Sequence, residues 1–338
     1  MILVTGGTGF IGSHLLYQLV DSGKKVKALK RPASSTKLTE KIFSYYSTDA
    51  ASKLKMIEWV DGDLKDYYSL TDALQDIEYV YHTAAVVSFH ASDKNEILKT
   101  NVEGTANLVN ACLEKKVHKL LFASSIGALG RANAEGIVDE ETHFQTSNKN
   151  SFYSTTKYEA EKEVWRGISE GLDAVIVNPA IVVGPGNWGR GSSQVFQTMW
   201  SGLRFYSTGM NGFIDVNDVA KAMILLMEGD FNGERYILNT ENVSYKQFFE
   251  WMAGAMNIPP PKIKAGPFLS GIGWRALKLK GIFTGKASGI TKETAKTANQ
   301  VYRYSNKKLI EATGIELIPV HESVKNTVGY FLQDHKKK

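Results

Sequence analysis

Hydrophobic and polar positions alternate between two rhythms along the first half of the chain. Short runs rich in β-branched residues occupy 2–5, 25–30, 55–60, 79–82, 119–124 and 174–178, and stretches with helical spacing lie near 10–22, 66–75, 94–115 and 152–170. Short apolar strands that alternate with helices are typical of successive β-α-β units. The pattern therefore predicts an α/β fold with a doubly wound parallel sheet.

The rhythm changes after Pro179. A glycine-rich loop covers 184–191, a helical pattern covers 215–229, a short strand is expected at 235–238, and the pattern beyond Ser244 is mostly helical. This predicts a smaller, mostly helical carboxy-terminal substrate lobe. We expect residues 1–178 and 213–240 to form a nucleotide-binding domain, and residues 179–212 and 241–338 to form the lobe.

Composition places the chain among soluble globular proteins. Its 338 residues are enough for a full core, and apolar and charged fractions of 43% and 22% argue against disordered and fibrous classes. The net charge of +5 includes the terminal lysines 336–338, which indicate a solvated tail rather than a nucleic-acid surface.

The single cysteine and the apolar runs bear on the compartment. Cys112 lies in an apolar helical stretch without a thiol partner or metal-ligand spacing, so neither a disulfide nor a metal site is expected. The strand pattern begins at Ile2, which leaves no room for a signal peptide, and no apolar run approaches the roughly 20 residues of a membrane span. A soluble, cytoplasmic protein without membrane attachment is expected.

A glycine-rich turn follows the first predicted strand. Residues 5–12 have the sequence TGGTGFIG and open the first predicted helix. Glycine permits positive φ and close approach of a phosphate, and amides at a helix amino terminus bind the pyrophosphate. The segment predicts a Rossmann-type dinucleotide site formed by Gly6, Thr8, Gly9, Phe10, Ile11 and Gly12.

Basic residues stand where an NAD-binding Rossmann fold usually has an acidic ribose ligand. Lys30 and Arg31 end the second predicted strand, and Lys37 follows. A carboxylate would repel a 2′-phosphate, whereas a guanidinium can bind one through two parallel hydrogen bonds. We therefore expect NADP, with NAD possible.

Tyr153 and Lys157 are four residues apart on a predicted helix, so both side chains emerge on one face. A neighbouring ammonium favours the phenolate, which makes a tyrosine usable as a proton donor or acceptor nearer neutrality. The pair predicts an acid/base site.

The segment TGGTGFIG and the pair Tyr153 and Lys157 together make the chain resemble the extended short-chain dehydrogenase/reductase superfamily, which includes the NAD-dependent epimerase/dehydratase family. Further similar segments are DGDL at 61–64, TAA at 83–85, NVEGT at 101–105, ASS at 123–125, NPAIVVGP at 178–185 and FIDVNDVA at 213–220. The resemblance adds Asp63, Leu64, Thr83, Ala84, Ala85, Pro179 and Ile181, besides Tyr153 and Lys157, to the expected cofactor contacts.

Within this superfamily the chain is most similar to dihydroflavonol-4-reductase-like proteins. The resemblance implies an oxidoreductase in which NADPH reduces a carbonyl and Tyr153 donates the proton. It also implies that Lys157 holds the nicotinamide ribose and lowers the pKa of Tyr153, that Ser125 binds the carbonyl, and that Asn101 supports the geometry or a proton relay.

Two other functions remain open. One is a nucleotide-sugar epimerase or dehydratase, although Ser125 is followed by Ile126 and Gly127 rather than the Asp-Glu pair of sugar dehydratases, and no arginine precedes Phe213. The other is a non-catalytic NAD(P)-binding scaffold or sensor, which would need neither Tyr153 nor Lys157.

A set of residues after the cofactor strand and in the glycine-rich loop is expected to face a small, partly apolar carbonyl substrate: Ser88, Phe89, His90, Asn187 and Trp188. The resemblance also suggests a homodimer through the helices at 94–115 and 152–170. No metal is expected.

Overall fold

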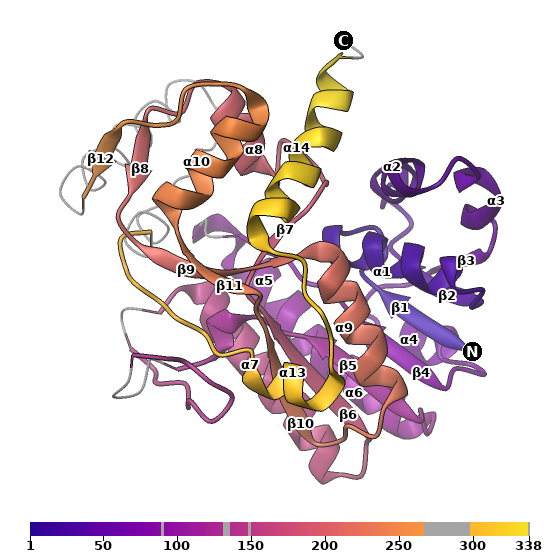
Figure 1. Cartoon of the computed structure of the whole chain (residues 1–338). Coiled ribbons are helices and arrows are strands. Elements are labelled where there is room, and N and C mark those ends of the chain that lie inside the picture. The colour runs from indigo at the N-terminus through magenta and orange to yellow at the C-terminus, as the bar shows by residue number, and fades with distance from the viewer. Residues whose placement is uncertain (89–90, 131–135, 148–149, 267–297, 337–338) are drawn as a thin grey trace.

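The computed structural model describes residues 1–88, 91–130, 136–147, 150–266 and 298–336 (Figure 1). A seven-stranded sheet with the order β10-β6-β5-β4-β1-β2-β3 forms its centre, and all its strand pairs are parallel. The strands are β1 (Ile2–Thr5), β2 (Val26–Lys30), β3 (Ile57–Asp61), β4 (Tyr79–His82), β5 (Lys119–Ala123), β6 (Ala174–Pro179) and β10 (Glu234–Leu238). The expected doubly wound Rossmann-type sheet is confirmed.

Helices cover both faces of this sheet because alternate strand residues point in opposite directions. Val4 packs with α1 (Phe10–Asp21) and α9 (Val216–Glu228) on one face. Leu3 packs on the other face with α4 (Tyr67–Ala73), α6 (Gly104–Glu114) and α7 (Phe152–Ser169). The order of strands reverses between β1 and β4, and open parallel sheets bind ligands at such a switch point.

The helix expected at 94–115 is interrupted. It consists of α5 (Lys94–Leu98), a π-helical turn η2 (Lys99–Glu103) and α6. Single π-turns inside α-helices are frequent at functional sites. Two short helices that the pattern did not predict, α2 (Lys37–Tyr46) and α3 (Ala50–Leu54), lie between β2 and β3.

A smaller lobe lies above the sheet in Figure 1. It contains the three-stranded sheet β11-β9-β7, the pair β12-β8 and three helices around one apolar core. These elements are β7 (Ile181–Val183), α8 (Gln194–Trp200), β8 (Phe205–Ser207), β9 (Met210–Asp215), β11 (Glu241–Ser244), α10 (Tyr245–Met256), β12 (Ile263–Ala265) and α14 (Val320–Lys336). Between the lobe segments, α13 (Lys307–Thr313) places Leu309 in the core of the large sheet.

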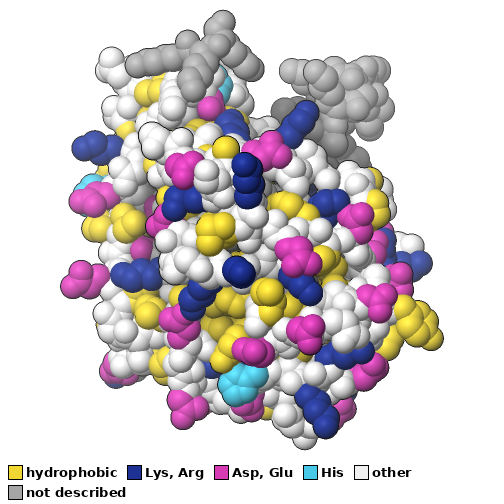
Figure 2. Space-filling model, turned by 90° about the vertical axis from the view of Figure 1, so that its right-hand side faces the viewer, with side chains coloured by type: hydrophobic (Ala, Val, Ile, Leu, Met, Phe, Trp, Pro, Cys, Tyr) yellow, Lys and Arg dark blue, Asp and Glu magenta, His cyan; other side chains and the backbone are white. Residues whose placement is uncertain are grey.

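The surface bears both signs of charge. On the face in Figure 2, Lys and Arg side chains are interspersed with Asp and Glu, and small apolar areas lie between them. The positive net charge is therefore not gathered into one patch on that face. None of the helices in the described part of the chain is both long enough and apolar enough to span a bilayer.

Candidate active site and cofactor cradle

The glycine turn after β1 leaves no room for side chains. Gly6 has φ +75°, and a Cβ on it would lie 2.5 Å from the amide nitrogen of Ala84. A Cβ on Gly12 would lie 2.2 Å from the carbonyl oxygen of Gly6. The turn closes through a 2.8 Å hydrogen bond from Gly9 N–H to Gly6 O, and α1 begins at Phe10. This tight backbone cradle at a helix amino terminus fits the pyrophosphate of a dinucleotide.

The other expected cofactor residues line the carboxyl ends of the neighbouring strands. Thr8 and Ile11 are partly exposed on the turn. Thr83, which precedes Ala84 and Ala85 after β4, donates a 2.7 Å hydrogen bond to the carbonyl oxygen of Thr5 in β1. Asp63 and Leu64 follow β3, Pro179 ends β6, and Ile181 opens β7. Because the strands are parallel, these segments all lie at the carboxyl edge of the sheet.

Of the three expected phosphate ligands, Lys30 is already paired. Its ammonium donates a 2.6 Å hydrogen bond to Asp61, its register partner on β3. Lys37 begins α2 and is exposed. The charge of Lys30 is compensated at the sheet edge, so this residue is a weaker candidate for the 2′-phosphate than its neighbour Arg31.

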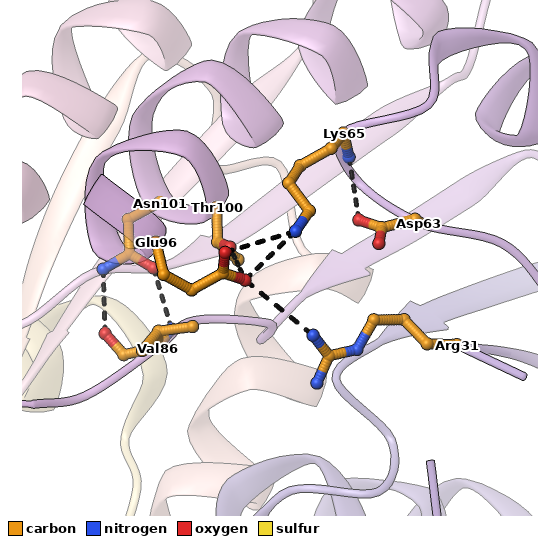
Figure 3. Close-up of polar contacts among 7 residues, drawn as sticks. All are labelled: Arg31, Asp63, Lys65, Val86, Glu96, Thr100 and Asn101. Atoms are coloured by element: carbon orange, nitrogen blue, oxygen red, sulfur yellow. Dashed lines mark hydrogen bonds and ion pairs between the residues drawn. The ribbon is translucent and has the colours of Figure 1, made fainter. Parts of the chain in front are cut away.

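Arg31 belongs to a cluster that the sequence did not predict (Figure 3). Its guanidinium lies 3.9 Å from the carboxylate of Glu96, and the ammonium of Lys65 lies 3.1 Å from the same carboxylate. Thr100 also donates a hydrogen bond to it. Lys65, Thr100 and Arg31 all lower the pKa of Glu96, with Lys65 the largest cause. Two cations from the ends of β2 and β3 thus share one carboxylate beside the cofactor edge.

The helix α7, which carries Tyr153 and Lys157, begins with a side-chain cap. The hydroxyl of Ser151 accepts a 3.0 Å hydrogen bond from the amide of Ser154, which sets the first turn. Tyr153 lies on that turn and Lys157 one turn later. The ammonium of Lys157 is buried and donates a 2.8 Å hydrogen bond to the carbonyl oxygen of Ala123, the last residue of β5.

Ser125 and Tyr153 meet at this point, as expected from the sequence. Burial raises the pKa of Tyr153 to about 12, and a hydrogen bond with Ser125 opposes the shift. A Cβ on Gly127 would lie 2.9 Å from the hydroxyl of Ser154, so glycine at this position allows α7 to approach the Ser125 loop. Burial lowers the pKa of Lys157 to about 8. The expected lowering of the Tyr153 pKa by Lys157 is not found, because burial dominates.

Asn101 acts on the backbone beside the cofactor (Figure 3). It is buried in the π-turn η2, where its Oδ1 accepts a 2.8 Å hydrogen bond from Val86 N–H and its Nδ2 donates a 3.0 Å bond to Val86 O. An amide that satisfies both the N–H and the C=O of one residue fixes the backbone of that residue in place. Asn101 therefore holds the segment after β4.

Three of the five expected substrate residues lie in the described part of the chain. Ser88 donates a hydrogen bond to Asp93, and Asn187 is exposed and accepts from the amide of Gly189. Phe89 and His90 lie outside the described residues. Trp188 differs from the expectation: it is buried in the lobe core, and its indole donates a 2.6 Å hydrogen bond to Asp334 on α14.

Two buried groups beside the site were missed. His82, at the end of β4, lies between the hydroxyls of Thr5 and Thr105 at 2.7 and 3.0 Å. Glu161 follows Lys157 by one helical turn and is buried. Its spacing from Lys157 was visible in the sequence, whereas its burial was not. The described part of the chain holds no group of three or more His, Cys, Asp or Glu residues placed to bind a metal.

A cavity of about 760 Å³ lies at the opposite edge of the sheet, among Ile2, Tyr79, Lys119 and Asp173. These residues stand at or before the amino ends of their strands. It is therefore remote from Ser125 and from the glycine turn, and it takes no part in the site.

Known proteins are similar to this chain over most of its length. The model of the NAD dependent epimerase/dehydratase family matches residues 2–239. Sterol demethylase protein B of Methylococcus capsulatus is 32% identical over 271 residues, 79% of this chain and 78% of its own. A putative dihydroflavonol 4-reductase of Synechocystis sp. is 29% identical and covers 98% of this chain and 94% of its own.

Solved structures share the whole fold. The crystal structure of gox2253 matches with a TM-score of 0.81 and 29% identity, over 99% of this chain and 98% of its own. A UDP-glucose 4-epimerase of Thermotoga maritima matches with a TM-score of 0.76 over 99% of each chain. At 21% identity, the second likeness bears on the fold alone.

Proposed function

Because the chain belongs to the NAD dependent epimerase/dehydratase family and is an NAD(P)-dependent oxidoreductase of the extended short-chain dehydrogenase/reductase type, we propose that it reduces a ketone or aldehyde with NADPH. The observation that carries the proposal is the meeting of Ser125, Tyr153 and Lys157 at the carboxyl edge of the sheet, the same edge that carries the glycine turn. A proton donor and a hydroxyl that binds a carbonyl oxygen are the groups this reaction requires.

Each residue of the site has a separate role in this reaction. The turn from Gly6 to Gly12 binds the pyrophosphate, and a bound reduced nicotinamide supplies a hydride to the carbonyl carbon. The Ser125 hydroxyl holds the carbonyl oxygen, and Tyr153 gives that oxygen its proton. A pKa of about 12 keeps Tyr153 protonated at neutral pH, so the phenol has a proton to give. Lys157 holds the ribose of the nicotinamide. Its ammonium, which donates to the carbonyl oxygen of Ala123 in this structure, either keeps that hydrogen bond when it binds the ribose or gives it up.

The preference for NADP rests on Arg31 and Lys65. Both cations flank the edge where the adenosine ribose would lie, and Glu96 is their shared counter-ion. A 2′-phosphate carries more charge than this single carboxylate and accepts bidentate bonds from a guanidinium. The 2′-phosphate of NADP therefore has two cations to bind here, and NAD has no phosphate at that position to use them.

The names of the relatives and the apolar residues near the site support a substrate class. The names of the relatives mention a sterol, a dihydroflavonol and cinnamoyl-CoA. In this chain Val86 and Val87 follow the cofactor strand, and Val87 is 52% exposed. An apolar side chain at this edge favours a partly apolar substrate with its carbonyl on or beside a ring.

The test separates net reduction from internal redox chemistry. The protein is incubated with NADPH and a panel of ring-bearing ketones and aldehydes, and separately with oxidised cofactor and UDP-, GDP- and dTDP-sugars. We expect cofactor consumption in step with alcohol formation in the first series. Epimerised or dehydrated sugar without net cofactor change would replace the reductase by an epimerase or dehydratase, and cofactor binding without turnover in either series would indicate a scaffold.

A further inference from the structure

A buried carboxylate lies behind the lysine of the active site. Glu161 follows Lys157 by one turn of α7, and only 1% of its surface is exposed. Residues four apart share one face of a helix, so both side chains enter the layer between α7 and the sheet. A buried carboxylate is costly unless hydrogen bonds and opposite charges compensate it. The hydrogen-bond and ion-pair partners of Glu161 therefore indicate its role.

These partners connect Glu161 to the backbone of the catalytic serine. Asn178 on β6 donates a 2.6 Å hydrogen bond from Nδ2 to the carboxylate, and the same nitrogen donates a 2.9 Å bond to the carbonyl oxygen of Ser125. On β10, a guanidinium nitrogen of Arg235 lies 3.6 Å from the other carboxylate oxygen. Glu161 is thus fixed by two strands of the sheet.

Lys157 has little other negative charge around it. Its direct acceptor is the neutral carbonyl of Ala123. Burial, and then the charge of Lys157, lowers the pKa of His82 to about 3, so this neighbour is neutral. Tyr153 is neutral as well, since burial raises its pKa. Among the described residues, Glu161 is the charged group that favours the ammonium form of Lys157 against its burial. Burial raises the pKa of Glu161, and hydrogen bonds with Ser124 and Asn178 and the charges of Arg235 and Lys157 oppose that rise and favour the carboxylate.

We propose that Glu161 is a positioning residue for the reduction: its carboxylate is the counter-charge of the Lys157 ammonium and couples it through Asn178 to the backbone of Ser125. The inference rests on the proposed function, because that function gives Lys157 the task of binding the nicotinamide ribose as a cation. Loss of the carboxylate should therefore change the pH range in which the cofactor binds, besides any effect on stability.

The experiment compares two amides on the same helix. Glu161→Gln removes the charge but keeps an acceptor for Asn178, whereas Glu159→Gln removes an exposed charge that pairs with Lys162. The affinity for NADPH is measured by calorimetry from about pH 5.5 to about pH 10. The variants and the unmodified protein are compared at each pH, so that the ionisation of the 2′-phosphate, with a pKa of about 6, affects them equally. Because unit charges about 6 Å apart at an effective dielectric of about 20 shift a pKa by about 2 units, we expect Glu161→Gln to move the alkaline midpoint down by about 1–2 pH units. Glu159→Gln should leave it unchanged.

Two further variants separate charge from folding. Glu161→Asp keeps the charge, and its midpoint should stay near that of the unmodified protein even where its melting temperature falls. If Glu161→Gln does not fold, the pair Glu161→Gln/Arg235→Gln leaves no uncompensated buried charge and should shift the midpoint in the same direction. An unchanged midpoint in the folded Gln variant, or an equal shift in Glu159→Gln, would overturn the inference. Since the measurement needs no substrate, failure to find a reducible carbonyl would contradict only the proposed function.

Discussion

Replacing Arg31 with Ala should reduce the affinity for NADPH and leave the affinity for NADH nearly unchanged. A hydrogen bond to a charged group is worth about 1.5–3 kcal/mol. Arg31 gives up its contact with Glu96 when it binds the 2′-phosphate, and this exposed pair, 3.9 Å apart, is worth about 0–1 kcal/mol. The net loss should therefore be about 0.5–3 kcal/mol, or about 2-fold to 150-fold in Kd.

Two neighbouring variants sharpen this expectation. Glu96→Gln frees Arg31 and Lys65 from their shared carboxylate, so it should tighten NADPH binding by up to about 1 kcal/mol, about fivefold. Lys30→Ala is the matched control, because its ammonium is committed to Asp61. It removes the same charge one residue away and should change NADPH affinity less than Arg31→Ala does.

Calorimetric titration of each variant with NADPH and NADH at low and moderate salt measures these effects. The difference between the cofactors should shrink as salt rises, because the cluster is partly exposed and is screened. Equal affinities of the unmodified protein for both cofactors would refute the reasoning. Equal losses in Lys30→Ala and Arg31→Ala would also refute it, since the ion pair between Lys30 and Asp61 would then have no influence on which residue binds the phosphate.

Three further outcomes follow from the geometry. Tyr153→Phe should keep cofactor binding and lower kcat by about 10²–10⁴-fold, because only the proton transfer is lost; unchanged turnover would place the donor elsewhere. Gly12→Ala should abolish cofactor binding in calorimetry, since its Cβ would lie 2.2 Å from Gly6 O, and normal binding would contradict the tight turn. The third concerns His14, whose pKa is lowered by burial to about 4. The unfolded chain then binds more protons below about pH 6.5, so stability should fall by up to about 3 kcal/mol as the pH drops to about 4. Urea unfolding should show a smaller fall in His14→Gln, and an equal fall would assign the acid lability to other groups such as His82.

The fold could be predicted because its strands and helices have different periods. Strands buried on both faces appear as short apolar runs, and the helices between them show a 3.6-residue spacing, so the order of elements is visible in the pattern. The π-turn around Asn101 could not be predicted, because one extra residue in a turn hardly disturbs an amphipathic pattern. The position of Trp188 was also hidden, because its partner Asp334 lies 146 residues further along the chain.

Lys30 and Arg31 show most clearly where sequence reasoning stops. They are adjacent, both are basic, and both stand at the end of the predicted second strand, so both are candidate phosphate ligands and only the guanidinium of Arg31 favours it. Register decides between them: Lys30 is the last residue of β2 that pairs with β3, and its partner there is Asp61. Arg31 lies one residue beyond the strand, outside the ladder, and meets Glu96 from the helix after β4. A one-residue step along the chain thus separates a cation compensated within the sheet from one held beside the cofactor edge, and only strand pairing distinguishes the two.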